Sequence, residues 1–118
     1  MNPIDKITIA VGKIDETVKF YSETFGISFN VMEIEGNKLY KGLLGDIEIL
    51  LCPKAFAGIE ATENTIQLRF VISDISVAID KGVKSGGTIL NDIFKSEGIS
   101  YASLRDPNGN SLELIQKA

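Results

Sequence analysis

The chain of 118 residues contains no histidine. This absence excludes the Ser-His-Asp and Cys-His catalytic arrangements, and it excludes every metal site that needs an imidazole ligand. A single cysteine, Cys52, cannot form an internal disulfide bond, which fits a reducing, cytoplasmic location. With no histidine to act as its base, Cys52 is interpreted as a small hydrophobic side chain and not as a nucleophile. Much of the common catalytic chemistry is therefore not open to this chain.

Long apolar segments and an excess of basic charge are also missing. No apolar run approaches the ~20 residues that a membrane-spanning helix needs, and the first residues, MNPIDKITIAV, lack the layout of a signal peptide. The net charge of −4 argues against nucleic acid and anionic membranes as partners. The hydrophobic content of 44% and the charged content of 24% are typical of a soluble globular domain of ordinary size.

Hydrophobic periodicity predicts a strand, a helix and three further strands in the first half of the chain. These five elements are expected at residues 6–11, 13–26, 27–35, 38–44 and 46–52. Asp15 is the predicted N-cap of the helix, and Gly26 is its predicted C-terminal stop. The next stretch, residues 53–64, shows little periodicity and is predicted to be an irregular connector.

The same order of elements repeats after the connector. The strand, the helix and the three strands are expected at residues 65–72, 73–87, 87–95, 99–104 and 110–116. Ser73 or Asp74 is the predicted cap of this second helix, and Gly86 its stop. Residues 1–118 are thus predicted to form one α+β domain of two βαβββ modules, about 1–53 and 65–118, whose curved mixed sheets carry the helices on their outer face.

Because the side chains of a strand alternate between its two faces, the sequence also predicts which residues share a surface. Each strand has one apolar face, which we assign to packing under the helices. The opposite face carries five polar side chains, namely Lys6, Glu48, Gln67, Arg69 and Glu113. Apolar residues share this face, so we expect a partly enclosed pocket there; a solvated or dimer-covered face is the alternative.

Three stretches of the sequence resemble one known family. KITIAVGKIDETVKFYSETFG is similar to the opening strand and helix of the vicinal oxygen chelate superfamily, QLRFVISDI to the start of its second module, and RDPNGNSLELIQ to its closing turn and strand. This superfamily includes glyoxalase I, extradiol dioxygenases and bleomycin-resistance proteins. The resemblance covers nearly the whole chain and implies a glyoxalase-like fold of paired βαβββ modules. It also implies a homodimer, since small members commonly complete their clefts by dimerising.

In metal-dependent members of the family, four side chains from the first and last strands of the two modules bind one divalent ion. The positions that match those ligands are Lys6, Glu48, Gln67 and Glu113. An ammonium repels a cation, and an amide oxygen is a weak ligand. No cofactor is therefore expected, although the two glutamates could hold a divalent ion weakly. We interpret Lys6 as a substitute for the metal ion, between the two glutamates, with Gln67 completing the hydrogen bonds.

Three roles stay open for this cluster: a structural ion pair, a contact to a ligand, or catalysis without a metal. With an aromatic wall added, the predicted ligand-binding residues are Lys6, Glu48, Gln67, Arg69, Tyr101 and Glu113. The resemblance implies a metal-independent small-molecule-binding protein of the glyoxalase/bleomycin-resistance type. The alternatives are a lyase, isomerase or dioxygenase with a non-standard metal site at Glu48 and Glu113, and a structural or regulatory dimer with a vestigial cleft. Neither the ligand nor any surviving catalytic activity follows from the sequence.

Overall fold

The computed structural model describes residues 5–58 and 67–117. The first module contains β1 (Lys6–Val11), α1 (Ile14–Phe25), β2 (Asn30–Ile34), β3 (Asn37–Leu44) and β4 (Ile47–Pro53), and a short helix, α2 (Lys54–Ala57), follows it. The second module contains β5 (Leu68–Val71), α3 (Ile75–Lys84), β6 (Thr88–Ser96), β7 (Ile99–Arg105) and β8 (Ser111–Gln116). No helix within the described ranges is long and apolar enough to span a membrane.

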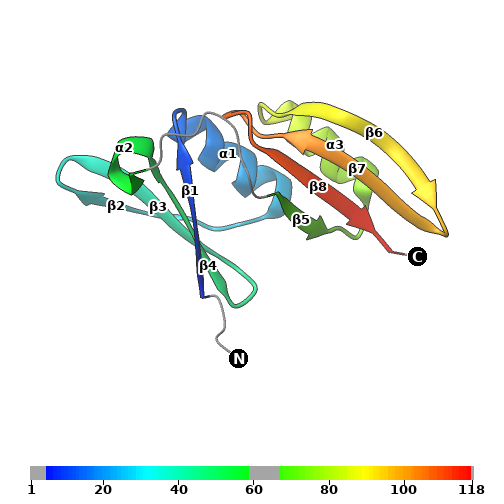
Figure 1. The fold of residues 1–118 in the computed structure, drawn as a ribbon, viewed down its shortest axis with the longest axis horizontal. Helices are drawn as coiled ribbons and strands as arrows, with labels where there is room; N and C mark the ends of the chain where they lie inside the picture. The colour runs from blue at the N-terminus through cyan, green and yellow to red at the C-terminus, as the bar shows by residue number, and fades with distance from the viewer. Residues whose placement is uncertain (1–4, 59–66, 118) are drawn as a thin grey trace.

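The strands form two four-stranded mixed sheets, which lie next to each other in the molecule (Figure 1). Their strand orders are β1-β4-β3-β2 and β5-β8-β7-β6. In each sheet the first and last strands of the module pair in parallel, whereas the remaining neighbours are antiparallel. The predicted α+β fold of two βαβββ modules with curved mixed sheets is thereby confirmed.

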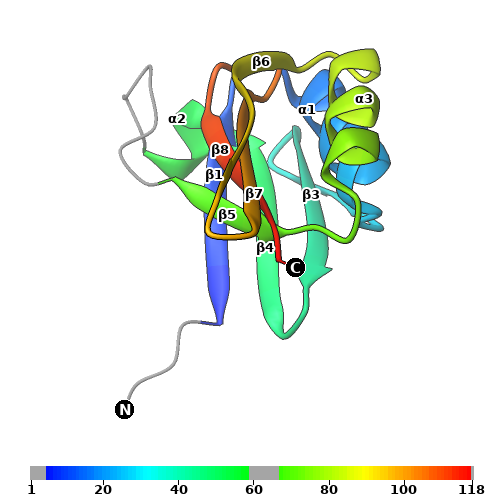
Figure 2. The same cartoon turned by 90° about the vertical axis from the view of Figure 1, so that its right-hand side faces the viewer.

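The two long helices cover the same side of the molecule. Helices α1 and α3 pack against each other across the two modules, and the sheets lie between them and α2 (Figure 2). Beneath these helices, the core contains the fully buried side chains of Phe20, Leu104 and Leu114 and that of Tyr21, which is 2% exposed. The apolar faces of β1, β4, β5 and β8 thus pack under the helices, as the alternation predicts, whereas the apolar side chains of β6 are largely exposed. The other face, which points away from α1 and α3, is called the open face below.

The sequence predicts an irregular connector after β4, but the structure shows that part of it is helical. Its first residues form α2, which packs against β1 and β4, while residues 59–64 lie outside the described ranges. Cys52 is buried near the end of β4 that leads into α2. This burial raises the pKa of the Cys52 thiol, which agrees with its interpretation as a hydrophobic side chain.

One predicted helix cap is wrong and two helix signals are confirmed. Lys13 and not Asp15 occupies the N-cap position of α1, with no side-chain cap hydrogen bond. Asp15 lies in the first turn, where the helix dipole still favours a carboxylate. Gly26 ends α1 with a positive φ of 70°, as predicted. The carboxylate of Asp74 caps α3 and accepts a hydrogen bond from the backbone N–H of Val77 at 3.2 Å.

The turn after β7 joins the second module to the first, and we call its contacts the inter-module clasp. The buried Asp106 carboxylate accepts hydrogen bonds from the Tyr21 hydroxyl on α1 (2.9 Å) and from the backbone N–H groups of Asn108 (2.9 Å) and Asn110 (3.0 Å). The Oδ1 of Asn108 accepts from the backbone N–H of Gly12 at 2.6 Å. Burial, and then the neighbouring Asp106 carboxylate, raise the pKa of Tyr21 well above its usual value, so the phenol remains a hydrogen-bond donor.

Candidate functional site

On the open face of the first sheet, one carboxylate lies between two lysines. Lys6 on β1 is directly opposite Glu48 on β4. The Nζ of Lys6 is 3.3 Å from Oε2 of Glu48, and the Nζ of Lys41 on β3 is 3.3 Å from Oε1. Burial acts to raise the pKa of Glu48, but the hydrogen bonds and positive charges of Lys6 and Lys41 outweigh it and lower that pKa. Both oxygens of this carboxylate are therefore paired with ammonium groups.

The open face of the second sheet carries a polar row across all four strands. Arg69 on β5, Glu113 on β8 and Ser103 on β7 lie opposite one another in turn, and Asn91 on β6 lies opposite Ser103. The Nε of Arg69 donates a hydrogen bond to Oε1 of Glu113. The Nδ2 of Asn91 donates to the Oγ of Ser103 at 2.8 Å. The row is thus built from an ion pair and an amide–hydroxyl pair.

An apolar row lies beside this polar row. Tyr101 on β7 is opposite Ile115 on β8, which is in turn opposite Val71 on β5. On its other side, Tyr101 stacks on Phe94 of β6, with ring centroids 5.3 Å apart and ring planes at 16°. Val71 is 67% exposed and Phe94 is 55% exposed. The open face of the second sheet therefore presents an aromatic stack next to hydrogen-bonding groups.

These contacts correct the interpretation of Lys6. Its ammonium lies with Glu48 alone, because Glu113 belongs to a separate ion pair with Arg69 on the other sheet. Within one chain, the structure thus does not bring the two glutamates to one lysine. These ion pairs do not test whether the six residues contact a ligand, and that stays a prediction.

Gln67 likewise does not complete the hydrogen bonds around Lys6. Its Nε2 donates to the Oγ of Ser111 at 3.2 Å. Lys6 lies eight residues before the start of α1, and Gln67 lies eight residues before the start of α3. This equal spacing supports the interpretation that the two residues occupy equivalent positions in the two modules. In the strand registers, however, Arg69 is the residue opposite Glu113, as Lys6 is opposite Glu48. The pairing between the first and last strands is therefore shifted by two residues in the second module. A shift of two residues keeps Gln67 and Arg69 on the same face of the sheet.

Sequence reasoning missed three polar residues of the open faces, namely Lys41, Asn91 and Ser103. The alternation within β3 and β7 is compatible with the positions of Lys41 and Ser103, whereas register shifts interrupt the alternation of β6 on both sides of Asn91. Alternation also does not give the register between strands. Only that register places Lys41 next to Glu48 and Asn91 next to Ser103.

The donors of the open faces do not fit the divalent metal ion that the resemblance implies. In residues 5–58 and 67–117, no group of three or more His, Cys, Asp or Glu side chains is placed to hold a metal ion. The oxygens of Glu48 face two ammonium groups, and an oxygen of Glu113 faces a guanidinium. A cation at either carboxylate would meet charge of its own sign.

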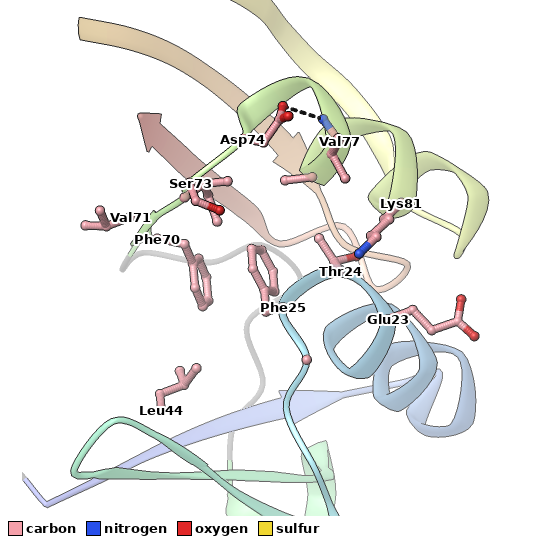
Figure 3. Close-up of a pocket in the computed structure, with 13 residues that line it drawn as sticks. Glu23, Thr24, Phe25, Leu44, Phe70, Val71, Ser73, Asp74, Val77 and Lys81 are labelled. Atoms are coloured by element: carbon pink, nitrogen blue, oxygen red, sulfur yellow. Dashed lines mark hydrogen bonds between the residues drawn. The ribbon is translucent and has the colours of Figure 1, made fainter. Parts of the chain in front are cut away.

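A pocket of about 440 Å³ opens at a different place, on the helix side of the molecule (Figure 3). It lies where the end of α1, the end of β5 and the start of α3 meet, so both modules contribute to it. Phe25 of α1 and Phe70 of β5 stack there, with ring centroids 3.9 Å apart. None of the six predicted ligand residues lines this pocket, which we call the seam pocket.

Solved structures with a similar fold include a glyoxalase-related enzyme from Fulvimarina pelagi, with a TM-score of 0.82 and 16% identity over 99% of this chain and 89% of that chain. TnmS3, an antibiotic binding protein from Streptomyces sp. CB03234, has a TM-score of 0.75 and 15% identity over 100% and 98%. A glyoxalase I mutant from Zea mays has a TM-score of 0.77 and 19% identity, over 97% of this chain and 46% of that chain. At these identities the likeness shows the fold alone.

Among curated proteins, no sequence matches this chain. A family model, by contrast, matches residues 3–114, which is nearly its whole length. That match agrees with the paired βαβββ modules and with the three stretches of sequence that resemble the family. The chain belongs to the Glyoxalase/Bleomycin resistance protein/Dioxygenase superfamily.

Proposed function

We propose that the protein binds a small organic molecule on the open faces of its sheets without the help of a metal ion. The observation that carries this proposal is the double pairing of Glu48, whose two oxygens each face a lysine ammonium at 3.3 Å. An ammonium supplies positive charge at the position where a family enzyme would hold its cation. The residues proposed to contact the ligand are Lys6, Glu48, Gln67, Arg69, Tyr101 and Glu113.

The chemistry of the second sheet supports an organic ligand with a flat apolar part and a polar edge. The Phe94–Tyr101 stack offers an aromatic surface, and the neighbouring row offers a guanidinium, a carboxylate, an amide and a hydroxyl. Binding sites for small molecules commonly combine an apolar surface with a few polar groups that fix orientation. The fold is shared with TnmS3, an antibiotic binding protein.

We further propose that a second copy of the chain completes the site. In the described part of the chain the strands form two separate sheets, and β1 and β5 each lie at an edge. A partner that placed its second sheet beside β1 would cover a free edge and bring its own Arg69–Glu113 pair next to Lys6 and Glu48. Light scattering is expected to give twice the chain mass of 12.8 kDa. A monomer at concentrations where ligands bind would contradict this arrangement.

Metal independence is tested directly on the protein purified without a tag and without chelators. Elemental mass spectrometry is expected to find substoichiometric metal, because the carboxylates are already paired with fixed cations. A ligand found by thermal-shift screening should then bind equally well before and after treatment with EDTA. Near-stoichiometric metal, or binding that EDTA abolishes, would overturn the proposal in favour of a lyase, isomerase or dioxygenase.

The double substitution K6H/Q67H provides a matched comparison for the same prediction. In the proposed dimer, an imidazole at position 6 with Glu48 from one copy, and an imidazole at position 67 with Glu113 from the other, would supply the nitrogen and oxygen donors that Zn²⁺ prefers. We expect this variant to gain Zn²⁺ affinity by calorimetry, whereas K6Q/Q67N, which removes the lysine without adding imidazoles, should not. If K6H/Q67H gains none, these two residues do not occupy the family's ligand positions.

A further inference from the structure

The seam pocket shares Val71 with the open face of the second sheet but contains none of the six predicted ligand residues, and its chemistry is different. We propose that it is a second binding site, for a small amphiphilic carboxylate: a molecule with an apolar body and one carboxylate at its end. This site does not depend on the function proposed for the open faces. Its volume of about 440 Å³ is within the range of pockets that enclose small organic ligands.

One wall of the pocket is a single face of α3. Asp74, Val77, Ala78 and Lys81 line it, and their spacing of three and four residues puts them on one side of the helix. This wall is apolar in its middle and charged at its two ends. The distance along the helix axis from Asp74 to Lys81 is about 10 Å, from a rise of 1.5 Å per residue. A ligand lying along this wall therefore has room for an apolar body between the two charges.

The opposite wall comes from the first module and from β5, and its apolar part lies beside Glu23 and Thr24, which also line the pocket. The stacked rings of Phe25 and Phe70 face the pocket, and Leu44 lies across from them (Figure 3). Val77, on the α3 wall, is 46% exposed although it lies among these apolar groups. An apolar ligand body that covered Val77 and the ring edges would remove this surface from water, which is favourable.

Lys81 is the cation that can hold the carboxylate. Figure 3 shows its side chain extended towards Thr24 of α1, while the carboxylate of Glu23 points away from the pocket. In the described part of the chain Lys81 forms no ion pair, whereas Lys84 on the same helix pairs with Asp80 at 3.0 Å. The carboxylate of Asp74 caps the helix at the far end of the wall. Positive charge is thus available at one end of the pocket only.

The test uses 2-naphthoate as the probe, titrated into ¹⁵N-labelled full-length protein and followed by NMR. We expect chemical-shift changes at residues that line the seam pocket. The exposed substitution K81Q should weaken binding about five-fold, the upper range for an exposed ion pair. The matched control K84Q, one turn further along α3, should leave binding unchanged. The neutral analogue 2-naphthalenemethanol should bind the wild type about five-fold more weakly than 2-naphthoate, for the same electrostatic reason.

Several outcomes would overturn the proposal. No binding at millimolar 2-naphthoate, or shift changes confined to the open face around Tyr101 and Ser103, would show that the seam pocket is not the site. Equal effects of K81Q and K84Q, or equal affinities for the acid and the alcohol, would show that no carboxylate is recognised there. Any of these results would overturn the seam-pocket proposal alone. The function proposed for the open faces has its own tests and would stand or fall separately.

Discussion

Replacing Asp106 with alanine is expected to lower the free energy of unfolding by about 3–5 kcal/mol, because it breaks a buried hydrogen-bond network. The Asp106 side chain is buried and accepts hydrogen bonds from Tyr21, from the backbone of Asn108 and from the backbone and side chain of Asn110. Alanine would leave these donors without their acceptor in a site that water reaches poorly. Urea unfolding followed by circular dichroism measures the change, since the chain has no tryptophan to report it by fluorescence.

The control for this prediction is Tyr21→Phe, which keeps the ring in the core and removes only the hydroxyl. We expect it to cost about 1–2 kcal/mol, the usual loss for one buried hydrogen bond. The double variant D106A/Y21F should be less destabilised than the sum of the single variants, because the two groups share one interaction. If D106A costs no more than Y21F, the carboxylate does not organise the turn, and the modules are joined by other contacts.

The inter-module clasp matters for function because it fixes the two modules relative to each other. The Tyr21–Asp106 hydrogen bond joins α1 to the turn that precedes β8, the strand that carries Glu113. The seam pocket also takes its walls from both modules. A loosened clasp should therefore disturb ligand binding in the seam pocket as well as stability.

Local patterns in the sequence were sufficient for most of the fold. Alternation within strands identified which side chains face the helices, because that property depends on each strand alone. The cap of α3 at Asp74 and the stop of α1 at Gly26 follow from side-chain and backbone chemistry within a few residues. The short helix α2 was missed because four residues are too few to show a helical period.

The partners of the site residues were not predictable in the same way. Lys6, Glu48 and Glu113 were placed on the correct faces, yet which cation meets which carboxylate depends on the register between strands distant in sequence. Lys41 reaches Glu48 through an antiparallel register, and Arg69 reaches Glu113 through a parallel one. The seam pocket escaped sequence analysis for a related reason, since its two walls come from different modules that meet only in the folded chain.

Replacing Gly87 with alanine is expected to lower the free energy of unfolding by about 2–3 kcal/mol, the usual cost of adding a methyl group to a well-packed site. Gly87 is buried between the end of α3 and the start of β6, and its backbone N–H donates to the carbonyl of Gly82 at 2.8 Å. An added Cβ would lie 2.9 Å from the carbonyl oxygen of Arg105 and 3.0 Å from that of Gly82, and it would overlap the ring of Phe20. Two of these three neighbours are backbone atoms, so the end of β7 at Arg105 and the last turn of α3 at Gly82 would have to move away from position 87.

Gly36→Ala is the matched control, because that glycine has the opposite properties. Its φ is +79°, which disfavours alanine, but nothing lies within 4 Å of an added Cβ. We expect a loss of about 1 kcal/mol there, from backbone conformation alone. Gly87, in contrast, has a φ outside the left-handed region, so its cost is steric. Equal losses in the two variants, measured by urea unfolding, would contradict crowding by Phe20, Gly82 and Arg105 as the reason for glycine at position 87.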